Sequence, residues 1–114
     1  MASLKQVQEI VDEGLEKFEE YPLEVRQKNL PDRTFEVLIL DYDKAYRGEV
    51  TDGEIVSLTF GAPGPRTDVR MVLTSDDLVA LHSGELKFAT AWASGRVRID
   101  ASIRDLLSLR TLAK

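Results

Sequence analysis

The chain has 114 residues, 43% hydrophobic and 31% charged, which predicts one globular domain spanning residues 1–114 with a core of its own. It contains no cysteine and a single histidine, which excludes a disulfide framework, thiol catalysis and zinc sites built from cysteines or several histidines. The formal net charge of −5 argues against nucleic acid as a partner, and no apolar run approaches the ~20 residues of a membrane-spanning helix.

The first predicted element is an amphipathic helix over residues 4–20. Ser3 and Gln6 have the spacing of a capping box, and apolar residues follow at helical intervals. The polar face of this helix is acidic, with Glu9, Asp12, Glu13, Glu16, Glu19 and Glu20. Such a run of charges indicates a solvated surface, and an acidic docking surface is the more specific alternative. Residues 22–33 contain two prolines and are interpreted as a connector, with a turn of helix left open.

The middle of the chain shows the alternation of apolar and polar residues that is typical of β-strands. The pair Asp52-Gly53 is a strong hairpin signal, and the glycines and prolines of residues 61–66 mark a loop. Because the segments follow one another closely, we expect them to pair antiparallel. The predicted strands are residues 34–43, 44–50, 54–60 and 67–74.

The last third of the chain returns to helices. Ser75 is expected to cap a short helix that ends at Gly84. A second short helix over residues 86–94 is expected to end at Gly95.

A short strand and a final helix complete the prediction. Residues 96–100 predict a strand whose Arg96 and Arg98 point outward, where solvated arginines are a simpler interpretation than a phosphate or carboxylate site. Ser102 is expected to cap a final helix that is apolar around much of its circumference.

No constellation of residues supports catalysis. The only histidine, His82, lies in a short helix and is interpreted as a polar-face residue. The loop sequence GAPGP resembles neither a phosphate-binding loop nor a dinucleotide fingerprint. Four aspartates occupy a strand end and a helix first turn, where aspartate is favoured for structural reasons alone: Asp41, Asp43, Asp76 and Asp77. We therefore predict that the protein is not an enzyme and has no cofactor and no metal.

Residues 67–100, TDVRMVLTSDDLVALHSGELKFATAWASGRVRID, resemble the sterol carrier protein type 2 family. In that family a strand runs into a Ser-Asp helix start, followed by a Gly-x-Leu turn, a short helix ending near Ala-Phe, and a Gly-Lys-Leu-Lys-Ile strand. The matching residues here are Ser75, Asp76, Asp77, Gly84, Leu86, Ala91, Trp92, Gly95, Arg96, Val97, Arg98 and Ile99. The order of a helix before the strands agrees as well.

The resemblance implies an α+β fold, with a mostly antiparallel sheet of about five strands covered on one face by helices and enclosing an apolar cavity. It also implies that the protein binds a fatty acid, fatty acyl-CoA or sterol-like lipid without acting on it as an enzyme. Whether it also transfers the lipid is left open. The apolar faces expected to line the cavity are those of Met71, Leu73, Leu78, Leu81, Phe88, Trp92, Leu106, Leu107 and Leu109.

The expected partner is a small hydrophobic ligand, with no nucleic acid and no integral membrane contact, and a protein partner or homodimer is left open. Neither a secretory start nor a peroxisomal C-terminal address is present, so we expect a cytoplasmic protein. The alternative is an accessory or protein-interaction module that keeps the fold with a filled cavity, because protein interiors are normally close-packed.

Overall fold

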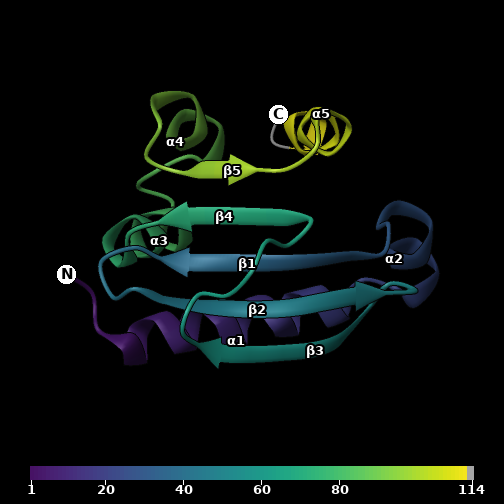
Figure 1. Ribbon diagram of the computed structural model, residues 1–114, viewed down its shortest axis with the longest axis horizontal. Helices are drawn as coiled ribbons and strands as arrows, with labels where there is room; N and C mark the ends of the chain where they lie inside the picture. Colours follow the sequence, from purple (N-terminus) through teal and green to yellow (C-terminus); the bar gives the residue numbers. More distant parts are fainter. Residues whose placement is uncertain (113–114) are drawn as a thin grey trace.

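The computed structural model describes the backbone of residues 1–112 and the side chains of residues 1–107 (Figure 1). Its helices are α1 (Leu4–Glu20), α2 (Leu23–Asn29), α3 (Ser75–Ser83), α4 (Phe88–Ser94) and α5 (Ile103–Leu112). Its strands are β1 (Arg33–Ile39), β2 (Lys44–Thr51), β3 (Glu54–Gly61), β4 (Val69–Leu73) and β5 (Arg98–Asp100), in the sheet order β3-β2-β1-β4-β5. The predicted α+β class with a mostly antiparallel sheet is confirmed.

One pair of strands departs from the expected antiparallel arrangement. Strands β1 and β4 run parallel, with Phe35 opposite Val69 and Ile39 opposite Leu73. The β3–β4 loop crosses β2 and β1 on the face of the sheet turned toward the viewer (Figure 1). Strand β4 therefore lies beside β1 instead of β3. The expectation that every short connection gives an antiparallel pair is wrong here, because this loop crosses two strands.

Helices α1 and α3 lie behind the sheet in Figure 1, while α4 and α5 lie along its β5 edge. The capping box of α1 is confirmed, since the backbone N–H of Gln6 donates to Ser3 Oγ at 3.1 Å and that of Ser3 donates to Gln6 Oε1 at 2.9 Å. The main core lies between helices and sheet and contains Val7, Ile39, Tyr46, Leu73, Leu86, Ala91 and Val97.

Capping residues close in sequence define most helix ends as predicted, but the N-terminal cap of α3 differs from the prediction. Gly84 and Gly95 end α3 and α4 in the left-handed conformation, with φ of 86° and 82°. The cap of α3 is Thr74, not the predicted Ser75: Thr74 Oγ1 accepts from the N–H of Asp77 at 3.1 Å. Ser75 is buried, and its hydroxyl donates instead to Asp41 at 2.6 Å.

Candidate ligand-binding groove

Most of the predicted lining residues meet in the core between the sheet and the helices. Leu73 is 1% exposed and belongs to the buried cluster itself. Partly buried side chains that pack against this cluster include Met71, Leu78, Leu81 and Phe88. Trp92 is half-buried beside Phe88, with ring centroids 6.0 Å apart.

The predicted residues of α5 lie elsewhere. Leu106 is half-buried and lines a hollow near β5, together with Glu36 and Arg70. Leu107 is 59% exposed, and the side chain of Leu109 lies outside the described residues. Among the side chains that are described, those of α5 thus stand apart from the core cluster around Leu73.

A groove of about 860 Å³ opens between α1, α2 and β3. Its apolar lining comes from Leu15, Phe18, Ile55, Val56 and Leu58, and its polar lining from Glu19, Arg26, Glu54 and Ser57. The volume falls within the roughly 300–1,000 Å³ that small-molecule sites occupy. Because Leu58 also packs against the core cluster, the groove leads toward the layer between helices and sheet.

The β2–β3 hairpin shapes one end of this groove by docking on α2. Asp52 and Gly53 occupy the left-handed region with φ of 51° and 77°, which the Asp-Gly turn predicts. A Cβ on Gly53 would lie 2.7 Å from the backbone N of Gln27, so only glycine allows this close approach. The N–H of Asp52 also donates to Asp32 Oδ1 at 2.9 Å, which fastens the turn to the segment before β1.

Arg26 differs from the other polar residues of the groove in having a buried donor atom. Its guanidinium carbon lies 4.9 Å from the centroid of the Phe18 ring, and its Nε is buried without a hydrogen-bond partner. An unpaired buried donor is costly, and because Nε is covered, a ligand oxygen reaches it only when the Arg26 side chain turns toward the groove. Sequence reasoning missed Arg26 because it assigned residues 22–33 to a connector, where nothing marks one arginine as a lining residue.

Three of the other polar groups singled out in the sequence, His82, Asp77 and Asp41, have side-chain partners. His82 Nε2 lies 2.6 Å from Glu13 Oε2, which joins α3 to α1. Asp77 pairs with Arg96, and Asp41 accepts hydrogen bonds from the Ser75 hydroxyl and backbone. Across the described residues, no three histidine, aspartate or glutamate side chains gather in a metal-binding cluster. No helix among them has the length and apolarity to cross a bilayer.

No protein-family model and no curated protein sequence matches the chain. Its fold is similar to that of solved structures of the sterol carrier protein 2 type. A crystal structure of sterol carrier protein 2 superposes with a TM-score of 0.63, 10% identity, and coverage of 86% of this chain and 85% of that one. A structure described as the UbiJ-SCP2 ubiquinone synthesis protein has a TM-score of 0.62, 15% identity, and coverage of 99% and 93%.

A different kind of protein also contains a similar unit. The sec-alkylsulfatase Pisa1 from Pseudomonas sp. superposes with a TM-score of 0.53 and 24% identity over 66% of this chain. The chain spans only 12% of that enzyme, and 13% of a double mutant of it. These similarities show an SCP2-like fold, which occurs both as nearly a whole protein and as a small part of a large one.

Proposed function

We propose that this SCP2-like domain binds a hydrophobic ligand, a fatty acid, fatty acyl or sterol-like lipid, without acting on it as an enzyme. The groove between α1, α2 and β3 would receive it. The observation that carries the proposal is the apolar groove that contains the unpartnered Nε of Arg26. The names of two structures with this fold support it, since sterols and ubiquinone are both hydrophobic molecules.

Burial of the ligand body would supply most of the affinity. Each methylene moved from water contributes about 0.8 kcal/mol, so an eight-carbon tail contributes roughly 6 kcal/mol before ordering costs. A head-group oxygen would accept from Arg26. Glu19 and Glu54 line the same groove and would repel a ligand carboxylate, but both are exposed, so water and salt screen the repulsion. An ester carbonyl, a hydroxyl and a carboxylate therefore all suit this position.

A longer ligand would continue past Leu58 into the layer between helices and sheet. There it would meet the predicted lining residues that the structure gathers in and around the core: Met71, Leu73, Leu78, Leu81, Phe88 and Trp92. This extension requires the core to open, because Leu73 is already 1% exposed. A role for Leu106, Leu107 and Leu109 stays a prediction.

The test is displacement of a fluorescent fatty acid from the purified protein by dodecanoate and by cholesterol. We expect saturable displacement, weakened roughly tenfold by Arg26→Gln because a charge-assisted hydrogen bond is lost. Arg98→Gln removes an equal charge from an exposed position on β5 and should leave affinity unchanged. No displacement by either compound, or equal losses in both variants, would refute the proposal.

The fluorescence emission of Trp92, the only tryptophan, shows whether the ligand stays in the groove or reaches the core. A ligand that reaches the core should change it, because the indole lies beside Phe88 at the core boundary. Binding without any change in emission would confine the ligand to the groove.

The protein-interaction module remains the second candidate, and the tight packing around Leu73 favours it. It predicts a folded protein with no measurable lipid affinity.

A further inference from the structure

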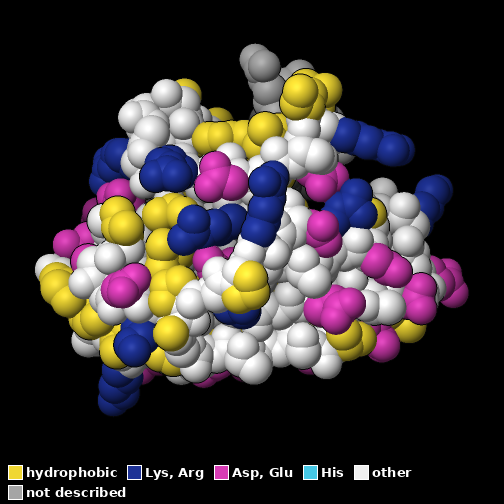
Figure 2. Space-filling model, viewed as in Figure 1, with side chains coloured by type: hydrophobic (Ala, Val, Ile, Leu, Met, Phe, Trp, Pro, Cys, Tyr) yellow, Lys and Arg dark blue, Asp and Glu magenta, His cyan; other side chains and the backbone are white. Residues whose placement is uncertain are grey.

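The open face of the sheet carries a row of charged side chains that lipid binding at the groove does not use. Neighbouring strands place Arg47, Glu36, Arg70 and Asp100 opposite one another in that order. Figure 2 shows lysine and arginine side chains gathered over the middle of this face. Glu36 is 2% exposed, with Oε2 at 2.9 Å from Arg47 Nε and Oε1 at 2.8 Å from Arg70 Nε. One carboxylate thus serves two guanidinium groups, which leaves one positive charge over.

The β3–β4 crossover loop is fastened to these three side chains. The N–H of Gly64 donates to Glu36 Oε2 at 3.0 Å, and the carbonyl of Pro65 accepts from Arg47 Nη2 at 2.6 Å. A Cβ on Gly64 would lie 2.0 Å from Arg47 Nη1, so the loop passes directly over that guanidinium. These contacts fix the backbone immediately before Arg66.

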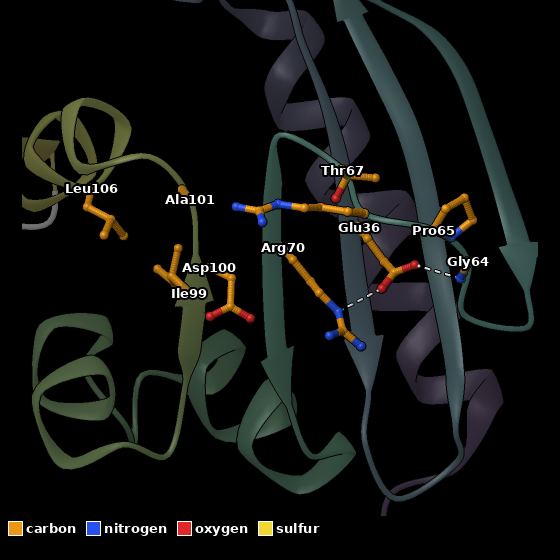
Figure 3. A pocket seen from close by; sticks show the side chains of 10 residues that line it. Glu36, Gly64, Pro65, Thr67, Arg70, Ile99, Asp100, Ala101 and Leu106 are labelled. Carbon is orange, nitrogen blue, oxygen red and sulfur yellow. Dashed lines mark hydrogen bonds and ion pairs between the residues drawn. The ribbon is translucent and has the colours of Figure 1, made fainter.

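Beside them lies a hollow of about 560 Å³ between the loop, β4, β5 and the start of α5 (Figure 3). In Figure 3, Ile99 and Leu106 stand on one side of the hollow, and Arg70 stands on the other with its guanidinium beside Glu36. The lining combines the charged residues Glu36, Arg66, Arg70 and Asp100 with the apolar residues Ile99, Ala101 and Leu106, and is completed by Gly64, Pro65 and Thr67.

The lining itself is balanced, with Arg66 and Arg70 against Glu36 and Asp100, and the positive surplus comes from neighbouring arginines. Arg66 is exposed and has no ion pair or hydrogen bond with any residue that the structure describes. Asp100 is half exposed, and its carboxylate lies 3.7 Å from Arg98 Nη2, which offsets its charge. The nearby Asp68 accepts hydrogen bonds from the backbone and hydroxyl of Thr34, outside the lining. The cations that line the hollow are therefore Arg66 and Arg70, while Arg47, outside the lining, shares Glu36 with Arg70.

We propose that this hollow binds a phosphate or sulfate group between Arg66 and Arg70. Arg66 on the loop and Arg70 on β4 both line the hollow, and guanidinium groups from two different elements suit a tetrahedral oxyanion whose oxygens lie in more than one plane. An alkyl group esterified to the oxyanion would lie against Ile99, Ala101 and Leu106. The hollow and the groove at Arg26 lie on opposite faces of the sheet, so this is a separate site.

The test is a titration of the ¹⁵N-labelled protein with inorganic phosphate and with octyl phosphate below its micelle concentration. We expect saturable shifts of the Gly64, Thr67 and Asp100 amides with both probes. With inorganic phosphate the Ser57 and Leu58 amides of the groove should not move. Tighter binding of octyl phosphate identifies an ester as the occupant, and equal affinity identifies free phosphate.

Variants separate a built site from general attraction to positive charge. Arg66→Gln should weaken both probes roughly tenfold, because it removes a charge-assisted hydrogen bond. Lys44→Gln removes an exposed cation from the start of β2 and should change neither affinity. Leu106→Ala should weaken octyl phosphate and leave inorganic phosphate unchanged.

Absence of saturable shifts, or equal weakening by Arg66→Gln and Lys44→Gln, would overturn the proposal. Neither result bears on lipid binding in the groove, which is tested at Arg26.

Discussion

The two faces of the sheet are buried for different reasons. Toward the helices, β1 presents Val37 and Ile39, which join a continuous apolar core. Toward the open side, the same strand presents Glu36 and Leu38, which are 2% and 6% exposed although no helix covers them. There Leu38 packs with Ala45 and Val72 in a second, smaller apolar cluster, and the crossover loop donates a hydrogen bond to Glu36. The helix-covered face therefore depends on apolar packing, while the open face adds to a small apolar cluster one carboxylate that contacts two neighbouring strands and a loop.

The largest loss of stability is expected on the helix-covered face. Leu73→Ala removes a side chain that is 1% exposed and leaves a cavity in the core, which should lower the free energy of unfolding by about 2–5 kcal/mol. Denaturant unfolding measures this loss. Leu40→Ala is the matched control, because Leu40 is 57% exposed and its truncation should cost no more than about 0.5 kcal/mol. Equal losses would contradict the burial pattern.

On the open face, Glu36→Gln should lower the free energy of unfolding by about 1–3 kcal/mol, because both arginines lose their carboxylate. The partial exposure of the arginines keeps the loss below that of a fully buried pair. Arg70→Gln should cost less, since Arg47 still pairs with Glu36. The same denaturation experiment orders the variants, and a larger effect of Arg70→Gln would show that Glu36 is not the centre of the network.

The loop contact can be tested with one methyl group. Gly64→Ala places a Cβ against the Arg47 guanidinium, the end of a flexible side chain, which moves aside by giving up its hydrogen bond to the Pro65 carbonyl, so the cost should be about 0.5–1.5 kcal/mol. Gly61→Ala meets nothing within 4 Å and should change the stability by less than about 0.5 kcal/mol. If both variants unfold at the same denaturant concentration, the loop does not rest on Arg47.

The smallest expected effect is on acid stability. The hydrogen bond from Arg33 lowers the pKa of Asp105 below its ordinary value of 3.8. Since the unfolded chain takes up this proton at higher pH than the folded one, the contribution is complete above about pH 5 and is lost as the pH falls through the lower folded pKa. Asp105→Asn should flatten the decline of unfolding free energy between about pH 5 and pH 2. A decline as steep in Asp105→Asn as in the unmodified protein would contradict this assignment.

Local patterns predicted what local interactions decide. The capping box at Ser3, the turn at Gly53 and the helix ends at Gly84 and Gly95 each depend on a few neighbouring residues, and all are present in the structure. Alternation along β4 also placed Met71 and Leu73 on one face, where they meet the core.

Long-range placement could not be predicted in the same way. The parallel pairing of β4 depends on where the crossover loop lands, and the burial of Glu36 depends on arginines from two other strands. One contact between α5 and the sheet is the ion pair of Arg33 and Asp105, which are 72 residues apart. The orphaned Nε of Arg26 arises only when α2 docks beside α1 and the β2–β3 hairpin. None of these contacts corresponds to a periodic pattern of residues in the sequence.

The most direct test of lipid binding at the groove is the observation of intermolecular nuclear Overhauser effects between ¹³C-labelled dodecanoate and the protein. The account predicts contacts from the ligand chain to the methyl groups of Leu15, Ile55 and Leu58. It also predicts a perturbed side-chain Nε–H of Arg26. Contacts only to Ile99 and Leu106 would place the lipid on the opposite face of the sheet. The absence of any contact would show that the protein does not bind dodecanoate. Either result would contradict the account.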